Sequence, residues 1–215
     1  MVEGTCFTYW ISEDYSAAFD DDGREQMALI MQRVKRMDGL INGILRYSRV
    51  GRIREKEERL DLNLLVNEVI ENIAPPDNIQ ITFENKLPVV LRDSIRMEQV
   101  FQNLLENAIK FMDKGEGIIK VGCADKGSYW EFSVSDNGPG IDNKYHDKIF
   151  QIFQTLTPRD ELESTGIGLT LVKKIIEIYG GSVRVESETG RGTTFFFTLP
   201  KKGKKYEIHQ AHPFS

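Results

Sequence analysis

The spacing of hydrophobic positions divides this 215-residue sequence into a helical first part and a mixed second part. Between positions 27 and 44 the apolar residues are separated alternately by three and four positions, which is the seam of a coiled coil or helical bundle. The members of this heptad seam are Met27, Ile30, Val34, Met37, Ile41 and Ile44. Residues 5–19 carry a second apolar set, and the AspAspAspGly run at 20–23 is predicted to end that first helix and form a turn.

The sequence therefore predicts a helical hairpin. A hairpin of two apolar-striped helices cannot bury both stripes alone, so we expect self-association as a homodimer through a four-helix bundle. Packing of the hairpin against the following domain is the alternative. The mixed charges at 51–59 predict either an exposed linker or a continuing helix end.

From residue 61 onwards the pattern alternates between helices and strands. Asp61 is placed to cap a short helix that ends before the prolines at 75–76. Apolar periodicity then predicts, in chain order, a strand at 79–84, a helix at 94–112, strands at 117–124 and 129–135, a helix at 170–179 and strands at 182–186 and 193–199. This order predicts an α+β fold, a two-layer α/β sandwich preceded by the hairpin.

The helix predicted at 94–112 carries a polar stripe. Its members, spaced i, i+3, i+4 and i+7, are Asn103, Glu106, Asn107 and Lys110. A solvated outer face is the simplest interpretation. However, asparagine gains nothing from an exposed position inside a helix, whereas its carbonyl oxygen is a good ligand for Mg²⁺. The stripe is therefore a candidate ligand-binding face.

Glycine-rich loops follow this helix in the sequence. Residues 136–140 read DNGPG at a strand end, where ligands approach α/β sheets, and Asp136 could accept a hydrogen bond from an amine such as that of adenine. Residues 164–169 read STGIGL ahead of a helix, whose first N–H groups favour phosphate. Tight turns are the alternative for the first loop, and a hairpin turn is the alternative for GRGTT at 190–194.

Composition and charge narrow the function. The sequence is 40% hydrophobic with a formal net charge of −5, which permits a core and argues against a general nucleic-acid binder. No apolar run approaches the roughly 20 residues that cross a bilayer, so no membrane contact is expected. Cys6 and Cys123 lack metal-ligand spacing, which indicates buried thiols in a reducing compartment and a cytoplasmic protein.

Five motifs in order resemble the N, G1, F, G2 and final Gly-Thr boxes of the ATP-binding domain of sensor histidine kinases. They read QNLLENAIKF, DNGPG, KIFQIFQTL, STGIGLTLVKK and GRGTTFFFTLP, and the resemblance extends over residues 61–200. The segment from EDYSAAFDDD to INGILRYSRVG is similar to the dimerisation and histidine-phosphotransfer hairpin of phytochrome-like kinases. The resemblance implies the ATP-binding sandwich of the histidine kinase, Hsp90 and gyrase type.

The resemblance also implies a role for each matching residue, with ATP and Mg²⁺ as cofactors. Asn107 would coordinate Mg²⁺, Asn103 would lie beside the metal and the triphosphate, and Lys110 would contact phosphate oxygens. Asp136 would bind the adenine amino group. Residues 141–165 would form a mobile lid. The residues that would contact the nucleotide or shape its loops are Gly138, Gly140, Ile141, Phe150, Phe153, Thr165, Gly166, Ile167, Gly168, Leu169 and Thr194.

The implied domains are a partial dimerisation and phosphotransfer hairpin at 1–58, an ATP-binding catalytic domain at 59–202 and a tail at 203–215. The implied activity is that of a protein-histidine kinase, a transferase that passes phosphate to a histidine and then to an aspartate of a response regulator. The acceptor histidine of the family lies on the first helix, whereas this sequence has only His146, His209 and His212, none of which fits. We therefore expect a piece of a longer kinase that does not phosphorylate itself; a natural protein without the acceptor is the alternative.

Two further function classes remain open from the sequence. The same fold serves ATPases that carry a catalytic glutamate where this sequence has Asn103, and steady-state ATP turnover would favour that class. An ATP-gated docking module for a response regulator is the other class, and regulator binding that persists without ATP binding would favour it.

Overall fold

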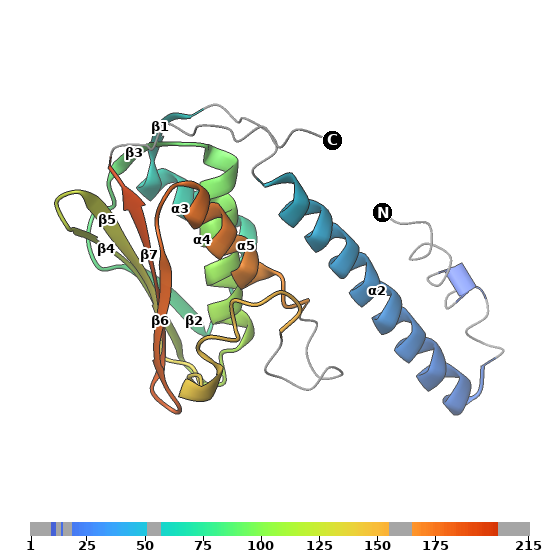
Figure 1. Ribbon diagram of the computed structural model, residues 1–215. Coiled ribbons are helices and arrows are strands. Elements are labelled where there is room, and N and C mark those ends of the chain that lie inside the picture. The colour runs from blue at the N-terminus through green and yellow to red at the C-terminus, as the bar shows by residue number, and fades with distance from the viewer. Residues whose placement is uncertain (1–9, 12–13, 15–18, 51–56, 155–164, 202–215) are drawn as a thin grey trace, which may run out of the picture. The chain divides into compact units, whose positions relative to one another are not determined.

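The computed structural model describes residues 10–11, 14, 19–50, 57–154 and 165–201. The chain forms two compact units, one made of residues 1–54 and 144–171 and the other made of residues 55–143 and 172–215. The second unit contains both β-sheets (Figure 1).

The main sheet has five strands in the order β2-β4-β5-β7-β6. Its parallel pair is β2 (Ile79–Phe83) and β4 (Gly117–Asp125), and the antiparallel neighbours that follow are β5 (Tyr129–Asp136), β7 (Gly192–Pro200) and β6 (Val183–Glu188). Buried residues alternate with more exposed ones along β5 and β7, so one face is covered and the other meets solvent. All five predicted strands are confirmed, with ends that differ by one or two residues.

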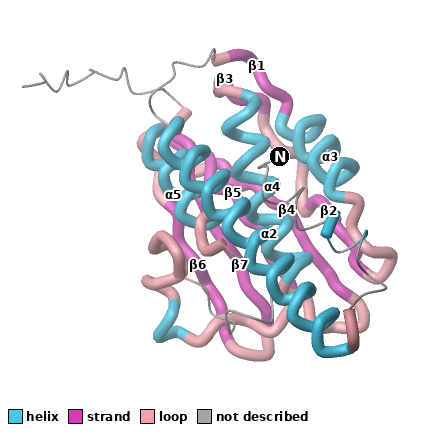
Figure 2. Tube along the Cα trace, turned by 90° about the vertical axis from the view of Figure 1, so that its right-hand side faces the viewer, coloured by secondary structure: helices cyan, strands magenta, loops and turns pink. Residues whose placement is uncertain are grey.

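Helices cover the buried face of this sheet (Figure 2). They are α3 (Leu62–Ile73), α4 (Ser94–Lys110) and the later part of α5 (Gly168–Ile178). Asp61 caps α3 by accepting the N–H of Asn63 at 2.8 Å, and Asp93 caps α4 by accepting the N–H of Arg96 at 2.8 Å. These carboxylates satisfy helix donors that would otherwise be unpaired. The predicted two-layer α/β sandwich is confirmed.

Three aromatic side chains fix α4 to the sheet. Phe101 of α4, Phe132 of β5 and Phe197 of β7 are fully buried. The rings of Phe132 and Phe197 are stacked with centroids 4.8 Å apart, and Phe101 meets Phe197 edge to face at 5.5 Å. Aromatic pairs of this kind add about 0.5–1.5 kcal/mol beyond area burial. The aromatic cluster therefore holds α4 on the two strands whose ends carry the candidate site.

A two-stranded sheet was not predicted from the sequence. It pairs β1 (Glu58–Asp61) with β3 (Val89–Arg92) in antiparallel register. The expectation of a linker or helix end at 51–59 is wrong for Glu58 and Arg59, which lie in β1; residues 51–56 are outside the described part of the chain. Four-residue strands are too short for their periodicity to be distinguished from a loop.

Two helix starts also differ from the prediction. The acidic run at 20–23 does not form a turn, because Asp20 caps α2 (Asp21–Arg49) by accepting the N–H of Gly23 at 2.8 Å. Acidic side chains stabilise a helix N-terminus, which is why this run begins a helix. The helix predicted from residue 170 begins two residues earlier, at Gly168. The first helix of the predicted hairpin, at 5–19, lies largely outside the described residues.

Most of the heptad seam of α2 is exposed in the single chain, with Met27 and Val34 partly covered. No residue of α2 is buried, and the exposed fractions are 47% for Ile30, 61% for Met37 and 45% for Ile41. An apolar stripe of this kind is typical of a helix that packs against a partner. None of the helices in the described ranges combines the length and apolarity needed to cross a membrane.

Candidate nucleotide-binding site

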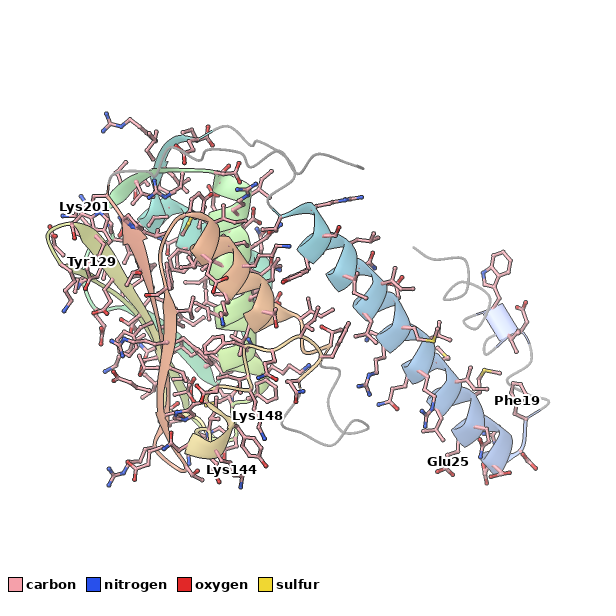
Figure 3. The ribbon with its side chains drawn as sticks, viewed as in Figure 1. Phe19, Glu25, Tyr129, Lys144, Lys148 and Lys201 are labelled. Atoms are coloured by element: carbon pink, nitrogen blue, oxygen red, sulfur yellow. The ribbon has the colours of Figure 1, made fainter. Side chains whose placement is uncertain are left out.

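Three polar side chains form a row across the ends of β5, β7 and β6. Asp136 lies directly opposite Thr193, and Thr193 lies directly opposite Ser187. Directly opposed residues of antiparallel strands project to the same face, which here is the helix-covered face that holds the aromatic cluster. Tyr129 and Lys201 lie together at the other end of β5 and β7 (Figure 3). The row therefore lies at the opposite end of the sheet from these two labelled residues.

The carboxylate of Asp136 is held by backbone donors. Its Oδ1 accepts the N–H of Gly138 at 2.9 Å and the N–H of Thr193 at 3.2 Å. Burial raises the pKa of Asp136 above its ordinary value, and the two hydrogen bonds partly oppose that shift. Within the described part of the chain nothing donates a hydrogen bond to Oδ2. That oxygen is therefore available to accept a hydrogen bond from a ligand.

Two glycines allow the β6–β7 turn to pack against the loop that follows β5. Gly140 has a φ of +72°, and a Cβ on it would lie 2.1 Å from the carbonyl oxygen of Glu188. Gly192 has a φ of +98°, and its Cβ would lie 2.0 Å from the carbonyl oxygen of Asp136. Both the left-handed backbone and the close approach require glycine. The DNGPG and GRGTT motifs are thus two sides of one packed junction.

Asn137 in the DNGPG motif has a structural role. Its Oδ1 accepts the N–H of Ile118 at 2.8 Å, and its Nδ2 donates to the carbonyl oxygen of Glu116 at 3.1 Å. The side chain therefore extends the pairing at the start of β4. Both of its polar groups are occupied by the backbone, so Asn137 is not a candidate ligand-binding residue.

The predicted polar stripe lies on α4, whose C-terminal end adjoins the same loop. A Cβ on Gly138 would lie 3.6 Å from the carbonyl oxygen of Phe111, the C-cap of α4. Asn103 donates its Nδ2 to the carbonyl oxygen of Gln99 at 2.6 Å, which leaves its Oδ1 for a ligand. Asn107, one turn later, makes no side-chain hydrogen bond to any residue that the structure describes. The structure thus presents two amide oxygens on one helix face, ahead of Lys110.

Seven of the predicted residues belong to the first unit: Phe150, Phe153, Thr165, Gly166, Ile167, Gly168 and Leu169. Phe153 and Gly166 both have a left-handed backbone, with φ of +65° and +66°, and the N–H of Phe153 donates to the carbonyl oxygen of Gly166 at 3.0 Å. Gly168 is the first residue of α5, where helical N–H groups lack helical partners. Residues 155–164 of the predicted lid lie outside the described residues.

The structure places Thr194 away from the predicted adenine side. Its hydroxyl donates to Ser135 Oγ at 2.9 Å, on the face of the sheet opposite to Asp136. The threonine that contacts Asp136 is Thr193, which is only 6% exposed. Sequence reasoning missed Thr193 and Ser187. The period of two along β7 contained the signal for Thr193, because only that threonine shares a face with the aromatic cluster.

A half-buried carboxylate at a sheet end, glycines beside it and an amide-bearing helix are typical of an α/β sandwich that binds a nucleotide. Residues 92–203 match the family model described as histidine kinase-, DNA gyrase B- and HSP90-like ATPase. The chain belongs to this family and carries the catalytic core of a sensor histidine kinase, as the sequence predicted.

Relatives and solved structures agree with this assignment. Cyanobacterial phytochrome B of Nostoc sp. is 37% identical over 198 residues, which cover 90% of this chain and 26% of that protein. The methanogenesis regulatory histidine kinase FilI of Methanothrix harundinacea is 35% identical and covers 90% of this chain and 22% of its own length. The chain thus spans about a quarter of the length of the curated relatives it matches.

Among solved structures, full-length ShkA in complex with AMPPNP is similar with a TM-score of 0.68 and 26% identity, covering 86% of this chain and 40% of that chain. The catalytic domain of histidine kinase ThkA is similar with a TM-score of 0.58 and 33% identity, covering 68% of this chain and 96% of that domain. The first similarity includes most of this chain, and the second includes nearly the whole of an isolated catalytic domain.

Proposed function

We propose that this chain binds ATP with Mg²⁺ and catalyses transfer of the γ-phosphoryl group to a histidine, from which it passes to an aspartate of a response regulator. Family membership and the similarity to AMPPNP-bound ShkA support this proposal. The position of Asp136 supports it further, because Oδ1 is fixed by two N–H groups while Oδ2 is left to accept a hydrogen bond from the adenine amino group.

The amide stripe on α4 fits Mg²⁺ by its chemistry. Mg²⁺ binds oxygen and usually takes few protein ligands, because phosphate oxygens and water supply the others. Asn107 and Asn103 each offer a carbonyl oxygen with no donor from the described residues, so we assign them as the protein ligands. When bound, the ion would neutralise negative charge on the triphosphate.

The proposed phosphate contacts are a side-chain cation and a set of backbone donors. Lys110 lies on the same stripe as the two asparagines and carries the positive charge. Gly166 and Gly168 stand at the start of α5, where N–H groups and the helix dipole favour an anion. The remaining residues of the proposed site, which would shape its loops and lid, are Gly138, Gly140, Ile141, Phe150, Phe153, Thr165, Ile167 and Leu169.

The side chain at position 103 supports a kinase over an ATPase. Attack by water needs a general base, and the carboxamide of Asn103 cannot take up a proton at neutral pH. Glu106 is the carboxylate of the stripe, but it is exposed and its Oε1 accepts a hydrogen bond from Gln102 Nε2 at 2.8 Å. A non-kinase ATPase is therefore the weaker candidate. An ATP-gated docking module would need only the residues that bind ATP and no catalytic group.

We further propose a homodimer through the heptad seam of α2, because its apolar side chains are exposed in the single chain. The receiver domain of a response regulator is the second proposed partner, and the setting is cytoplasmic. In this proposal residues 1–58 form part of the dimerisation and phosphotransfer hairpin, residues 59–202 form the catalytic domain and residues 203–215 form a tail.

Transfer of label from γ-labelled ATP tests the proposal. The chain alone should acquire no acid-labile phosphate, because His146, His209 and His212 all lie outside the helical hairpin. A second chain that carries the complete first helix of the family should be labelled when the two are mixed, and Asp136→Asn in this chain should lower that labelling at limiting ATP. Acid-labile phosphate on this chain alone, or none in the mixture, would contradict the proposal.

A further inference from the structure

Ser187 joins three backbone segments at the candidate site through one hydroxyl group. Its Oγ accepts the N–H of Ile141 at 2.7 Å and donates to the carbonyl oxygen of Gly192 at 2.8 Å. The same Oγ lies 3.0 Å from Oγ1 of Thr193. Ile141 follows the DNGPG loop, and Gly192 begins β7, so the Ser187 hydroxyl connects the DNGPG and GRGTT motifs.

The direction of the hydroxyl–hydroxyl contact follows from counting protons. A hydroxyl has one proton to donate and two lone pairs to accept. The carbonyl oxygen of Gly192 can only accept, so it takes the proton of Ser187. In the remaining contact the donor must therefore be Thr193, whose Oγ1 then has only lone pairs left.

The direction of this hydrogen bond determines whether the site presents donors or acceptors to the purine base of a nucleotide. Thr193 is the cross-strand partner of Asp136 on the same face. With its proton turned toward Ser187, the Thr193 hydroxyl keeps only acceptor lone pairs, on the same face of the sheet as the carboxylate of Asp136. Two acceptors suit a 6-amino group, which donates, and they repel a 6-oxo group, which accepts.

We propose that Ser187 is a positioning residue that makes this pocket select a 6-amino purine over a 6-oxo purine, by fixing the hydroxyl proton of Thr193 away from the base. The inference rests on the proposed function, because it concerns the ATP pocket. Without the Ser187 hydroxyl, the Thr193 proton is released and can donate to a 6-oxo group. Discrimination should then fall, whatever happens to overall affinity.

The test compares ATP with inosine triphosphate, which carries an oxygen in place of the 6-amino group and has no 2-amino group. Affinities for both are measured by calorimetry on the full chain, for the wild type and for Ser187→Val and Ser187→Thr, which have matched shape. We expect Ser187→Val to lower the preference for ATP by about three- to tenfold, as one hydrogen bond corresponds to about that factor, while Ser187→Thr retains it. The loss of the backbone hydrogen bonds of Ser187 should weaken the binding of both nucleotides equally, so this effect cancels in the ratio of the two affinities.

Ser182→Ala is the control in the same strand pair. Ser182 Oγ lies 3.2 Å from Thr198 Oγ1 at the far end of the β6–β7 ladder, so its loss removes a similar hydroxyl contact without touching the site. Equal ATP-to-inosine ratios for Ser187→Val and Ser187→Thr would overturn the inference and leave ATP binding intact. Absence of ATP binding by the wild type would instead overturn the proposed function and this inference with it.

Discussion

Replacing Asp136 with asparagine exchanges only the Oδ2 atom for an NH₂ group, and this exchange should change ligand binding but leave the fold intact. In the wild type Oδ1 receives two backbone N–H groups, and no described residue donates to Oδ2, which is the proposed contact of the adenine amino group. The carbonyl oxygen of asparagine can occupy the Oδ1 position and keep both backbone hydrogen bonds. Its NH₂ group then replaces Oδ2, so that a donor meets the donor of the adenine amino group.

The expected loss of affinity follows from that exchange. Removing a hydrogen bond to a charged acceptor costs about 1.5–3 kcal/mol. This free energy corresponds to a roughly ten- to hundredfold weaker binding of ATP. The donor–donor contact adds to the loss, so tenfold is the lower end of the expectation.

The thermal stability of Asp136→Asn should not fall with its affinity for ATP. Burial raises the pKa of Asp136 in the folded chain above its ordinary value of 3.8. The carboxyl therefore stabilises the fold when protonated, below its ordinary pKa, and that contribution is lost as the pH rises through the raised value. Because asparagine does not titrate, Asp136→Asn without nucleotide should melt at or above the wild-type temperature at pH 7. The advantage of the variant should shrink as the pH falls.

Two measurements on the same preparations check this reasoning. Calorimetric titration with ATP gives the affinity, and thermal melting at several pH values without nucleotide gives the stability. Unchanged affinity would remove Asp136 from the site. A large drop in melting temperature at pH 7 would show that the carboxylate charge supports the fold, contrary to the pKa that burial raises.

Three further variants test other parts of the molecule. Asn107→Ala should weaken ATP binding more with Mg²⁺ than with a chelator, and equal calorimetric losses would refute its role as a metal ligand. Val34→Asp combined with Ile41→Asp should yield monomers in light scattering, because it places charge in the seam; a monomeric wild type would refute the dimer. Gly192→Ala should lower the melting temperature, since its Cβ would lie 2.0 Å from the Asp136 carbonyl oxygen; an unchanged melting temperature would contradict that clash.

Much of the fold could be predicted because each large element carries its own periodicity. α4 and β7 each bury one side, and the resulting stripes are visible in the sequence at periods of 3.6 and 2. Asp61 could be identified as a cap from its position before an apolar helix, and the structure confirms it. These signals are local, so they do not depend on which segments become neighbours.

The features that were missed depend on pairing between distant segments. The short strand β3 buries Arg92, whose guanidinium lies 5.0 Å from the ring centroid of Tyr179. A charged residue at this buried position interrupts the alternation of apolar residues by which a strand is identified in a sequence. The choice between Thr193 and Thr194 depends on the register of β7 with β5. Ser187 becomes a junction only when β6 pairs with β7, and nothing in its own neighbourhood marks it in the sequence.

The DNGPG motif combines two physical tasks. Asn137 ties the loop to the start of β4 with both of its amide groups, and the N–H of Gly138 fixes one oxygen of Asp136. No described residue donates a hydrogen bond to the second oxygen of Asp136. Partial burial raises the pKa of Asp136, and the two backbone hydrogen bonds oppose that shift only in part. In the proposed ATP site, the adenine amino group would donate to the second oxygen and stabilise the carboxylate, so the environment that raises the pKa would also favour a donor on the ligand.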